Sequence, residues 1–313
     1  MLRKSCGVSV ARWLLLLALT LSFAACSKTQ KPSAKGFASP DEAGNALMAA
    51  AQKGDQNAIL AILRPDAKEL VYSGDPVEDK AAIDAFVAGY SVMHRWRKIE
   101  DGDQILLIGA DNFPFPIPLK KNASGQWFFD TDAGKDEILS RRIGRNELAI
   151  IDVCESMADA QAEYFSQVHD GRGPKQYALK FISDQGKQNG LYWEPTEGQP
   201  RSPLGPLVAF ATDEGYRVKP DQQAAFHGYK FRMMSRQGSH ARGGAQDYMS
   251  NGKAVRGFAF VSYPAEYGNS GIMTFLINQD GVLFEKDLGK TTVEVATAMS
   301  EFNPDPSWKP LEQ

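Results

Sequence analysis

One long apolar stripe in the middle of the chain does most to limit how it can fold. Within residues 133–167, apolar side chains recur every three or four positions, at Leu148, Ile151, Cys154, Met157, Ala158 and Tyr164. This spacing places them on one side of an α-helix, which another layer must then cover. Because glycine weakens helix interiors, we expect Gly144 to interrupt this helical region.

The segments that follow predict a sheet as that covering layer. Residues 184–227 are rich in Gly, Pro and Gln and indicate mostly loop. From Tyr229 onward, strand-like runs alternate with turn sequences such as Asn251-Gly252, which favour hairpins. The expected strands span 229–234, 245–249, 254–263, 272–277 and 282–286, and a short helix follows at 291–299. Together they predict a long helix packed on an antiparallel β-meander.

The first half of the chain predicts a smaller helical and β region. Ser39-Pro40-Asp41-Glu42 combines an N-cap, a proline at the first helical position and a capping box. Helices are expected from there, at 58–63 and at 79–97, followed by strands at 104–108, 115–119 and 126–130. Helices before a curled antiparallel sheet resemble the cystatin-like cone fold. The predicted class is therefore α+β, with domains at residues 38–132 and 133–313.

The first 37 residues predict export and a lipid anchor. Residues 1–12 carry three positive charges, and the apolar stretch 13–25 is too short to span a bilayer comfortably, as in a signal peptide. A transmembrane anchor is the alternative. Phe23-Ala24-Ala25-Cys26 resembles the lipobox of bacterial lipoproteins, which implies acylation of Cys26. Residues 26–37 are then expected to form a polar tether. Ser27, rather than Asp, follows the cysteine, and by resemblance to enteric lipoproteins this favours anchoring in the outer membrane, with the protein facing the periplasm.

Charge and cysteine content limit the partners. Without residues 1–25 the chain has 32 basic and 38 acidic residues, a net charge of −6, which does not attract nucleic acid. Cys6 leaves with the signal peptide and Cys26 is acylated, so Cys154 has no disulfide partner in the chain. Its place in an apolar helical pattern indicates a buried, inert thiol.

No motif predicts a metal, a cofactor or a catalytic residue. The four histidines, at 94, 169, 227 and 240, are far apart, and the sequence has no Cys-x-x-Cys. Ser250-Asn251-Gly252-Lys253 matches Ser-x-x-Lys, but its place between two β patterns favours a hairpin turn.

One set of residues could bind a ligand through aromatic rings and nearby polar groups. It comprises Trp193, His227, Tyr229, Arg232, Tyr263, Glu266 and Tyr267. Such rings stack on sugars or peptides, and the charged groups could fix orientation. The alternative is that the rings are ordinary core residues and that Arg232 and Glu266 form an ion pair. Arg141, Arg142 and Arg145 indicate a solvated helix face.

Six short segments of the chain carry a resemblance when they are taken together. They are Phe113-Pro114-Phe115-Pro116-Ile117-Pro118, Ala133-Gly134-Lys135, Ile143-Gly144-Arg145-Asn146-Glu147, Gly190-Leu191-Tyr192-Trp193, Ser202-Pro203-Leu204-Gly205-Pro206-Leu207 and Tyr263-Pro264-Ala265-Glu266-Tyr267-Gly268. Together they resemble a family of bacterial envelope proteins, the domain of unknown function 2950. The likeness spans residues 38–309 and implies no catalytic residues. The second half is also similar to pseudopilin-like domains, which act by assembly.

These observations lead to three functional hypotheses. The first is a non-catalytic binding or assembly module with an envelope protein partner. The second is a glycan- or peptidoglycan-binding protein, which requires the aromatic rings to be exposed in one cleft. The third is an envelope hydrolase, which requires a histidine close to a serine or carboxylate in a pocket.

Overall fold

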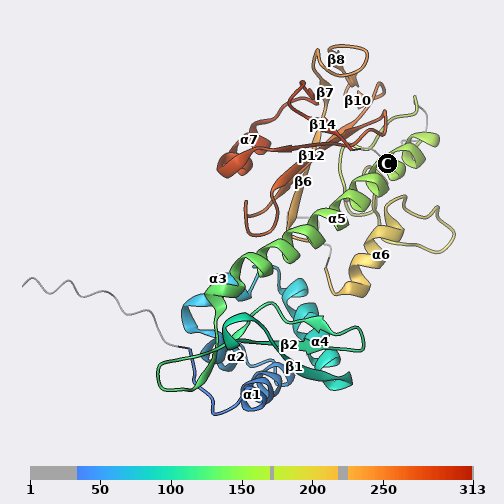
Figure 1. The fold of residues 1–313 in the computed structure, drawn as a ribbon. Coiled ribbons are helices and arrows are strands. Elements are labelled where there is room, and N and C mark those ends of the chain that lie inside the picture. The colour runs from blue at the N-terminus through green and yellow to red at the C-terminus, as the bar shows by residue number, and fades with distance from the viewer. Residues whose placement is uncertain (1–33, 170–172, 218–224, 312–313) are drawn as a thin grey trace, which may run out of the picture. The chain divides into compact units, whose positions relative to one another are not determined.

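Helix α5, Thr131–Ser166, is the longest element of the structure and packs against both halves of it (Figure 1). The computed structural model describes residues 34–169, 173–217 and 225–311, and residues 32–313 form one compact unit. The predicted signal peptide and Cys26 lie outside the described residues. Asp130 caps α5 by accepting a hydrogen bond from the backbone N–H of Ala133 at 3.2 Å.

The expected interruption at Gly144 is wrong, because α5 continues through it without a break. A single glycine costs a helix only about 1 kcal/mol relative to alanine. Contacts made by the rest of the helix offset that cost: Ile138 packs against the N-terminal core, while Ile150, Cys154 and Met157 pack against the C-terminal core.

Replacing Gly144 with Ala is expected to raise the free energy of unfolding by about 0.5–1 kcal/mol. A Cβ atom added at Gly144 would meet no atom within 4 Å, so the substitution gains helix propensity without a clash. Urea denaturation of the two proteins measures the difference. A loss of stability would mean that α5 bends at this position in solution.

The N-terminal half has helices around a small antiparallel sheet. The helices are α1 (Pro40–Gln52), α2 (Gln56–Leu63), α3 (Lys68–Val71) and α4 (Pro76–Val92), with 3₁₀ turns at Pro65–Ala67 and Glu100–Gly102. The strands are β1 (His94–Lys98), β2 (Gln104–Ile108), β3 (Phe113–Pro114), β4 (Leu119–Lys121) and β5 (Trp127–Phe129), in the order β1-β2-β4-β5 with β3 pairing with β2. Leu47, Ile59, Leu119 and Phe129 are among the residues of its core.

The predicted start of the first helix is confirmed, whereas the predicted end of the helix at 79–97 is wrong. Ser39 Oγ accepts a hydrogen bond from the backbone N–H of Glu42 at 3.1 Å. Helix α4 ends at Val92, and residues 94–98 form strand β1, which pairs antiparallel with β2. Pairing with the next strand of the chain overrides the helical pattern there.

The C-terminal half is a five-stranded antiparallel sheet between two helical layers. Its strands are β6 (Tyr229–Met234), β11 (Ala259–Pro264), β12 (Met273–Asn278), β13 (Phe284–Asp287) and β14 (Lys309–Pro310), in the order β14-β13-β12-β11-β6. On one side of the sheet, Cys154 and Met157 of α5 pack with Phe260. On the other side, Ala296 of α7 (Thr292–Ala298) packs with Val261. A 3₁₀ turn at Gly289–Thr291 precedes α7. The predicted α+β class and the helix followed by a meander are confirmed.

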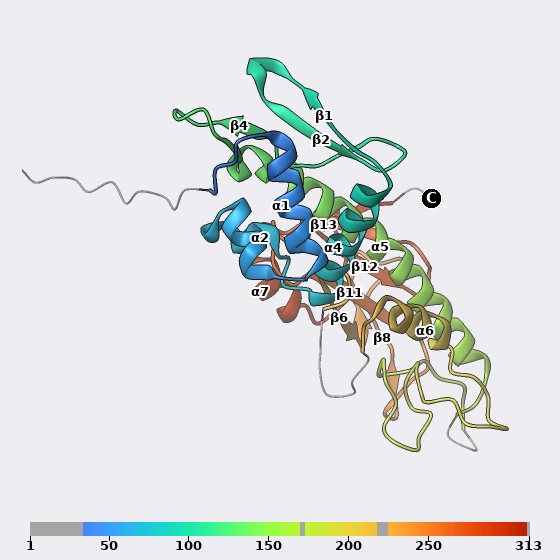
Figure 2. The same cartoon turned by 90° about the horizontal axis from the view of Figure 1, so that it is seen from below.

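Short elements complete this half. Two ribbons pair β7 (Arg236–Gln237) with β8 (Gln246–Asp247), and β9 (Met249–Ser250) with β10 (Lys253–Ala254). The turn at Asn251-Gly252 joins β9 and β10, so the predicted hairpin is confirmed. Helix α6 (Gly205–Glu214) lies in a segment predicted to be loop, and it runs beside the second half of α5 in both ribbon views (Figures 1 and 2).

Candidate functional site

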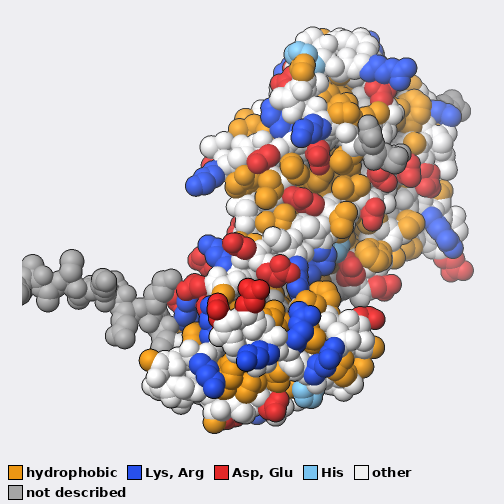
Figure 3. All heavy atoms as spheres, in the orientation of Figure 1, with side chains coloured by type: hydrophobic (Ala, Val, Ile, Leu, Met, Phe, Trp, Pro, Cys, Tyr) orange, Lys and Arg blue, Asp and Glu red, His pale blue; other side chains and the backbone are white. Residues whose placement is uncertain are grey.

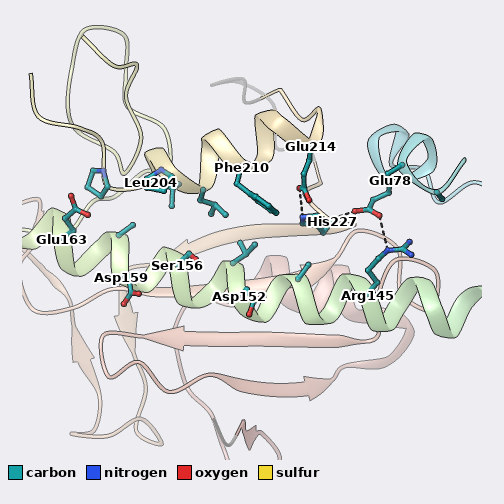
Figure 4. A pocket seen from close by; sticks show the side chains of 18 of the residues that line it. Glu78, Arg145, Asp152, Ser156, Asp159, Glu163, Leu204, Phe210, Glu214 and His227 are labelled. Carbon is teal, nitrogen blue, oxygen red and sulfur yellow. Dashed lines mark hydrogen bonds and ion pairs between the residues drawn. The ribbon is translucent and has the colours of Figure 1, made fainter. Parts of the chain in front are cut away.

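A groove of about 870 Å³ lies between α4, α5 and α6 (Figure 4). This volume falls within the usual range for ligand pockets. Its lining comprises Glu78, Ala81, Ala82, Ala85, Arg145, Ala149, Asp152, Val153, Ser156, Asp159, Ala160, Glu163, Pro203, Leu204, Pro206, Leu207, Phe210, Glu214 and His227.

Small side chains create the hollow, and larger apolar ones border it. Helix α5 contributes Ala149, Ser156 and Ala160, whose short side chains leave space above the helix. From α6, Leu207 and Phe210 line the groove, and Phe210 is 54% exposed although it is a large apolar residue. Figure 4 shows Phe210 pointing from α6 towards α5. Pro206, Leu207 and Phe210 together give the groove a continuous apolar border, and contiguous exposed apolar surface is typical of a binding site.

Acidic side chains border the same groove. Asp152, Asp159 and Glu163 are exposed along one face of α5, and no ion pair joins them to another described residue. Among the described lining residues, Arg145 is the single lysine or arginine. Hydrophobic and acidic side chains lie next to one another over the face that carries α5 and α6 (Figure 3). The groove therefore combines apolar surface with unpaired negative charge.

At one end of the groove, His227 lies between two carboxylates. Its Nδ1 is 2.7 Å from Glu78 Oε1, and its Nε2 is 3.2 Å from Glu214 Oε2. The other oxygen of Glu78 is 3.4 Å from Nε of Arg145, which continues the chain of ion pairs (Figure 4). His227 thereby ties α4 to the end of α6 just before the chain enters β6.

A second polar contact holds Glu78 and His227 in place. Asp75 caps α4 by accepting hydrogen bonds from the backbone N–H groups of Val77 and Glu78. The other carboxylate oxygen of Asp75 accepts a hydrogen bond from the hydroxyl of Tyr216 at 2.8 Å. That hydroxyl in turn accepts one from the backbone N–H of His227 at 3.3 Å, which fixes the turn carrying the histidine.

The carboxylates favour the charged form of His227. Burial alone would lower the pKa of His227, but the hydrogen bond to Glu78 and the charges of Glu214, Glu78 and Asp75 outweigh it and raise the pKa. The hydrogen bond to His227 lowers the pKa of Glu78. Both nitrogens of the imidazole are occupied, so neither is free to take a proton from a nucleophile.

Of the seven residues predicted as a ligand-binding set, His227 alone lines the groove. Trp193 is buried, and its Nε1–H donates to the carbonyl of Pro200 at 3.0 Å. Tyr229 is fully buried and donates its hydroxyl to the carbonyl of Met273 at 2.9 Å. Tyr263 is also buried, in the core on the α7 side of the sheet.

The charged members of that set have separate partners. Arg232 donates to the carbonyls of Ala296 and Met299, and no ion pair joins it to Glu266. Glu266 instead accepts from the side-chain amide of Asn269 at 2.7 Å, and the Tyr267 hydroxyl donates to Asp287 at 3.2 Å. None of these six residues lines the groove with His227, and their binding of a glycan stays a prediction.

The prediction that the three arginines of α5 lie on a solvated helix face is wrong for Arg142. Its side chain is buried and donates to the side-chain oxygen of Asn269 and, at 2.6 Å, to the carbonyl of Leu70. Burial lowers its pKa. Arg142 therefore joins α5 to helix α3 and to the turn that carries Asn269.

Most of the groove has no local signal in the sequence. Glu78 and His227 are 149 positions apart, and Glu214 and Phe210 lie in a helix that was expected to be loop. The one available clue was the helical spacing of Ala149, Ser156 and Ala160, which lie seven and four positions apart on the second side of α5. Helix α5 thus has one apolar face and a second face of small residues. Two such faces on one helix indicate two neighbours, which are the sheet and α6.

Cys154 is expected to resist alkylation in the folded protein. Burial raises the pKa of its thiol to about 12, although the Ser262 hydroxyl 3.1 Å away acts in the opposite direction. At pH 8 its reaction with iodoacetamide should be at least roughly 1,000-fold slower than in urea, because the thiolate is the reactive form. Mass spectrometry of the peptide containing Cys154 measures both rates, and similar rates would show that the core around it opens readily.

Among the described residues, no cluster of three or more His, Cys, Asp and Glu side chains is arranged to hold a metal ion. No described helix is both long and apolar enough to cross a membrane.

Comparison with known proteins gives a family but no activity. Neither the curated proteins nor the solved structures contain a match to this chain. A family described as "Protein of unknown function (DUF2950)" matches residues 34–311, which include every residue of the groove. The chain belongs to the DUF2950 family.

Proposed function

We propose that this protein is an exported, lipid-anchored protein of the bacterial envelope that binds a partner protein through the groove between α5 and α6. The observation that carries the binding role is the groove itself, in which exposed Phe210 faces a helix of small residues. Large apolar side chains left exposed beside a hollow are typical of surfaces that a partner covers.

Two features favour binding over catalysis. The described histidine at the groove has a carboxylate oxygen within 2.7 Å of one ring nitrogen and within 3.2 Å of the other, so neither nitrogen faces the open groove as a general base would. The Cys154 thiol is buried on the other side of α5, against the sheet. The hydrolase hypothesis requires a histidine close to a serine or carboxylate in a pocket, and His227 meets this through Glu78 and Glu214. Among the described lining residues, however, no hydrogen bond joins His227 to Ser156, the one hydroxyl side chain of the groove.

Export and anchoring rest on the sequence. The positively charged start, the apolar stretch at 13–25 and the small residues before Cys26 support a signal peptide and a lipidation site. An acylated cysteine with two or more chains would hold the protein stably at a membrane. The polar tether at 26–37 would let the folded part reach partners away from the bilayer.

Metabolic labelling with an alkyne analogue of palmitate tests the anchor. We expect the wild-type protein to incorporate label and the Cys26→Ala protein to carry none. Equal labelling of the two would show that Cys26 is not the anchor, and absence of label from both would exclude acylation.

Photo-crosslinking in living cells tests the binding role. A photoreactive phenylalanine analogue replaces Phe210 in one strain and Val92, which is 70% exposed on a different helix, in a control strain. We expect one discrete protein adduct from position 210 and none from position 92. No adduct, or the same adducts from both positions, would contradict a partner at the groove.

A further inference from the structure

We propose that the partner segment held in the groove is a basic amphipathic α-helix, which presents apolar side chains to Phe210 and lysine or arginine side chains to the carboxylates of α5. This inference rests on the proposed binding role and adds the chemistry of the partner.

The helical form of the partner follows from the elements that line the groove. They are the helices α4, α5 and α6, the turn before α6 and the turn that carries His227, and none of the lining residues belongs to a strand. Helices bond their own backbone groups, so the groove offers no row of free N–H and C=O groups to an extended peptide. A helix brings its backbone already satisfied and needs only side-chain contacts.

The length of the partner follows from α5. Residues of this helix line the groove from Arg145 to Glu163. At 1.5 Å per residue this stretch is about 27 Å long, which matches a partner helix of about 18 residues. Ala149, Ser156 and Ala160 recur along the stretch and allow a second helix to approach closely.

The apolar face of the partner is required by α6. Phe210 is 54% exposed and Leu207 is partly exposed, and both line the groove beside Pro206. Covering this surface removes apolar area from water, which is the main driving force of most associations. A partner helix would meet it with apolar residues at intervals of three and four positions.

The charge of the partner follows from α5. Asp152, Asp159 and Glu163 lie seven and four residues apart, which places their carboxylates about 10 Å and 6 Å apart along the helix axis. None of the three has an ion-pair partner among the described residues. A basic helix would supply the opposite charge, whereas an acidic one would be repelled. The described lining holds a single arginine, Arg145, already close to Glu78, so little opposes a basic partner.

A synthetic peptide tests this directly. The probe is a fluorescein-labelled 18-residue peptide of leucine and lysine in helical spacing, and fluorescence polarisation measures its binding to the full-length chain in phosphatidylcholine nanodiscs. Empty nanodiscs give the blank. Two further probes serve as controls. One replaces every lysine with glutamate, and the other keeps the composition but alternates leucine and lysine, which removes the helical spacing. We expect only the first probe to bind, and more weakly at 300 mM than at 50 mM NaCl.

Two groove variants and one matched control locate the binding. We expect Phe210→Ser, and separately the triple variant Asp152→Asn, Asp159→Asn, Glu163→Gln, to weaken binding of the basic probe about tenfold. The control triple Glu69→Gln, Asp136→Asn, Glu294→Gln removes the same charge from exposed positions outside the groove and should change it less than twofold. All the changed side chains are exposed, and circular dichroism verifies that the variants fold.

The outcomes separate this inference from the proposed function. Equal binding of the basic and acidic probes, or loss of binding in the control triple, would overturn the basic-helix proposal. The basic-helix proposal would also be overturned if position 210 gave an adduct in cells but the basic probe did not bind. Self-association of the chain through the groove would overturn it as well. Absence of any groove adduct in cells would instead overturn the binding role itself.

Discussion

Replacing Gly271 with Ala is expected to lower the free energy of unfolding by about 3 kcal/mol. A Cβ atom at this position would overlap the hydroxyl of Tyr229 and lie 2.5 Å from its Cζ and 2.6 Å from its Cε2. Tyr229 is fully buried between α5 and the sheet, so its ring has no free space into which it could move.

The backbone at Gly271 has little freedom to move away instead. The next two residues, Ile272 and Met273, donate their backbone N–H groups to one oxygen of Glu147 on α5, at 2.8 and 2.9 Å. The Tyr229 hydroxyl also donates to the carbonyl of Met273. A shift of this turn would therefore break several buried hydrogen bonds at once, which adds to the cost of the overlap.

Urea denaturation measures the effect, and the Gly144→Ala protein serves as the control. Both substitutions add one methyl group to a glycine, yet one meets a buried ring and the other meets open space. We expect opposite signs for the two changes in unfolding free energy. A loss below about 0.5 kcal/mol for Gly271→Ala would show that Tyr229 and this turn rearrange freely.

Local sequence chemistry predicted those parts of the fold that depend on neighbouring residues. The β9–β10 hairpin forms as predicted, with Asn251 and Gly252 both at positive φ, the conformation that Asn-Gly favours in a two-residue turn. The start of α1 at Ser39-Pro40 and the strand at 229–234 also match the structure. In each case the signal lies within about six residues of the feature.

Two elements differ from the prediction because strand pairing and helix-end signals outweighed the residue pattern of their segments. Residues 94–98 carry His, Arg, Trp, Arg and Lys, and pairing with β2 makes them a strand. Helix α6 lies in a segment rich in glycine and proline, but Pro206 suits the first turn of a helix and Gly215 ends it in the left-handed conformation.

The candidate site was the least predictable part, because its residues meet only after folding. His227 was singled out for its neighbours in sequence, the tyrosine and arginine of β6, whereas its contacts are Glu78 and Glu214. Buried rings explain the other predicted positions, since Trp193, Tyr229 and Tyr263 are core residues. An aromatic and charged composition alone did not distinguish a cleft from a core.

Replacing His227 with Ala is expected to lower the free energy of unfolding by about 3 kcal/mol at pH 6. The substitution removes a side chain that is only 9% exposed and leaves Glu78, which is 13% exposed, without its closest cationic partner. Arg145 remains 3.4 Å from the other oxygen of Glu78, so the remaining charge is partly compensated. The loss is large because a broken buried pair leaves one charge desolvated.

The stabilising effect of His227 should depend on pH in a defined direction. Burial alone would lower the pKa of His227, but the carboxylates that face it, Glu78, Glu214 and Asp75, outweigh burial and raise its folded pKa above the value of about 6.5 expected for the unfolded chain. The cation Arg145 lies on the far side of Glu78. A raised folded pKa contributes stability that is fully present below the unfolded pKa. That contribution is lost as the pH rises through the folded pKa, because above it the histidine is neutral in both the folded and the unfolded protein.

Urea denaturation between pH 5 and pH 9 measures this dependence. The difference in unfolding free energy between wild type and His227→Ala should be largest near pH 5–6 and should shrink steadily at higher pH. His240→Ala is the matched control, since His240 is exposed and should give a small difference at every pH. A His227→Ala difference that stayed constant or grew with pH would mean that the histidine is neutral in the folded protein. The contact with Glu78 would then be a neutral hydrogen bond, and the two carboxylates would not hold α4 and α6 together through a charge.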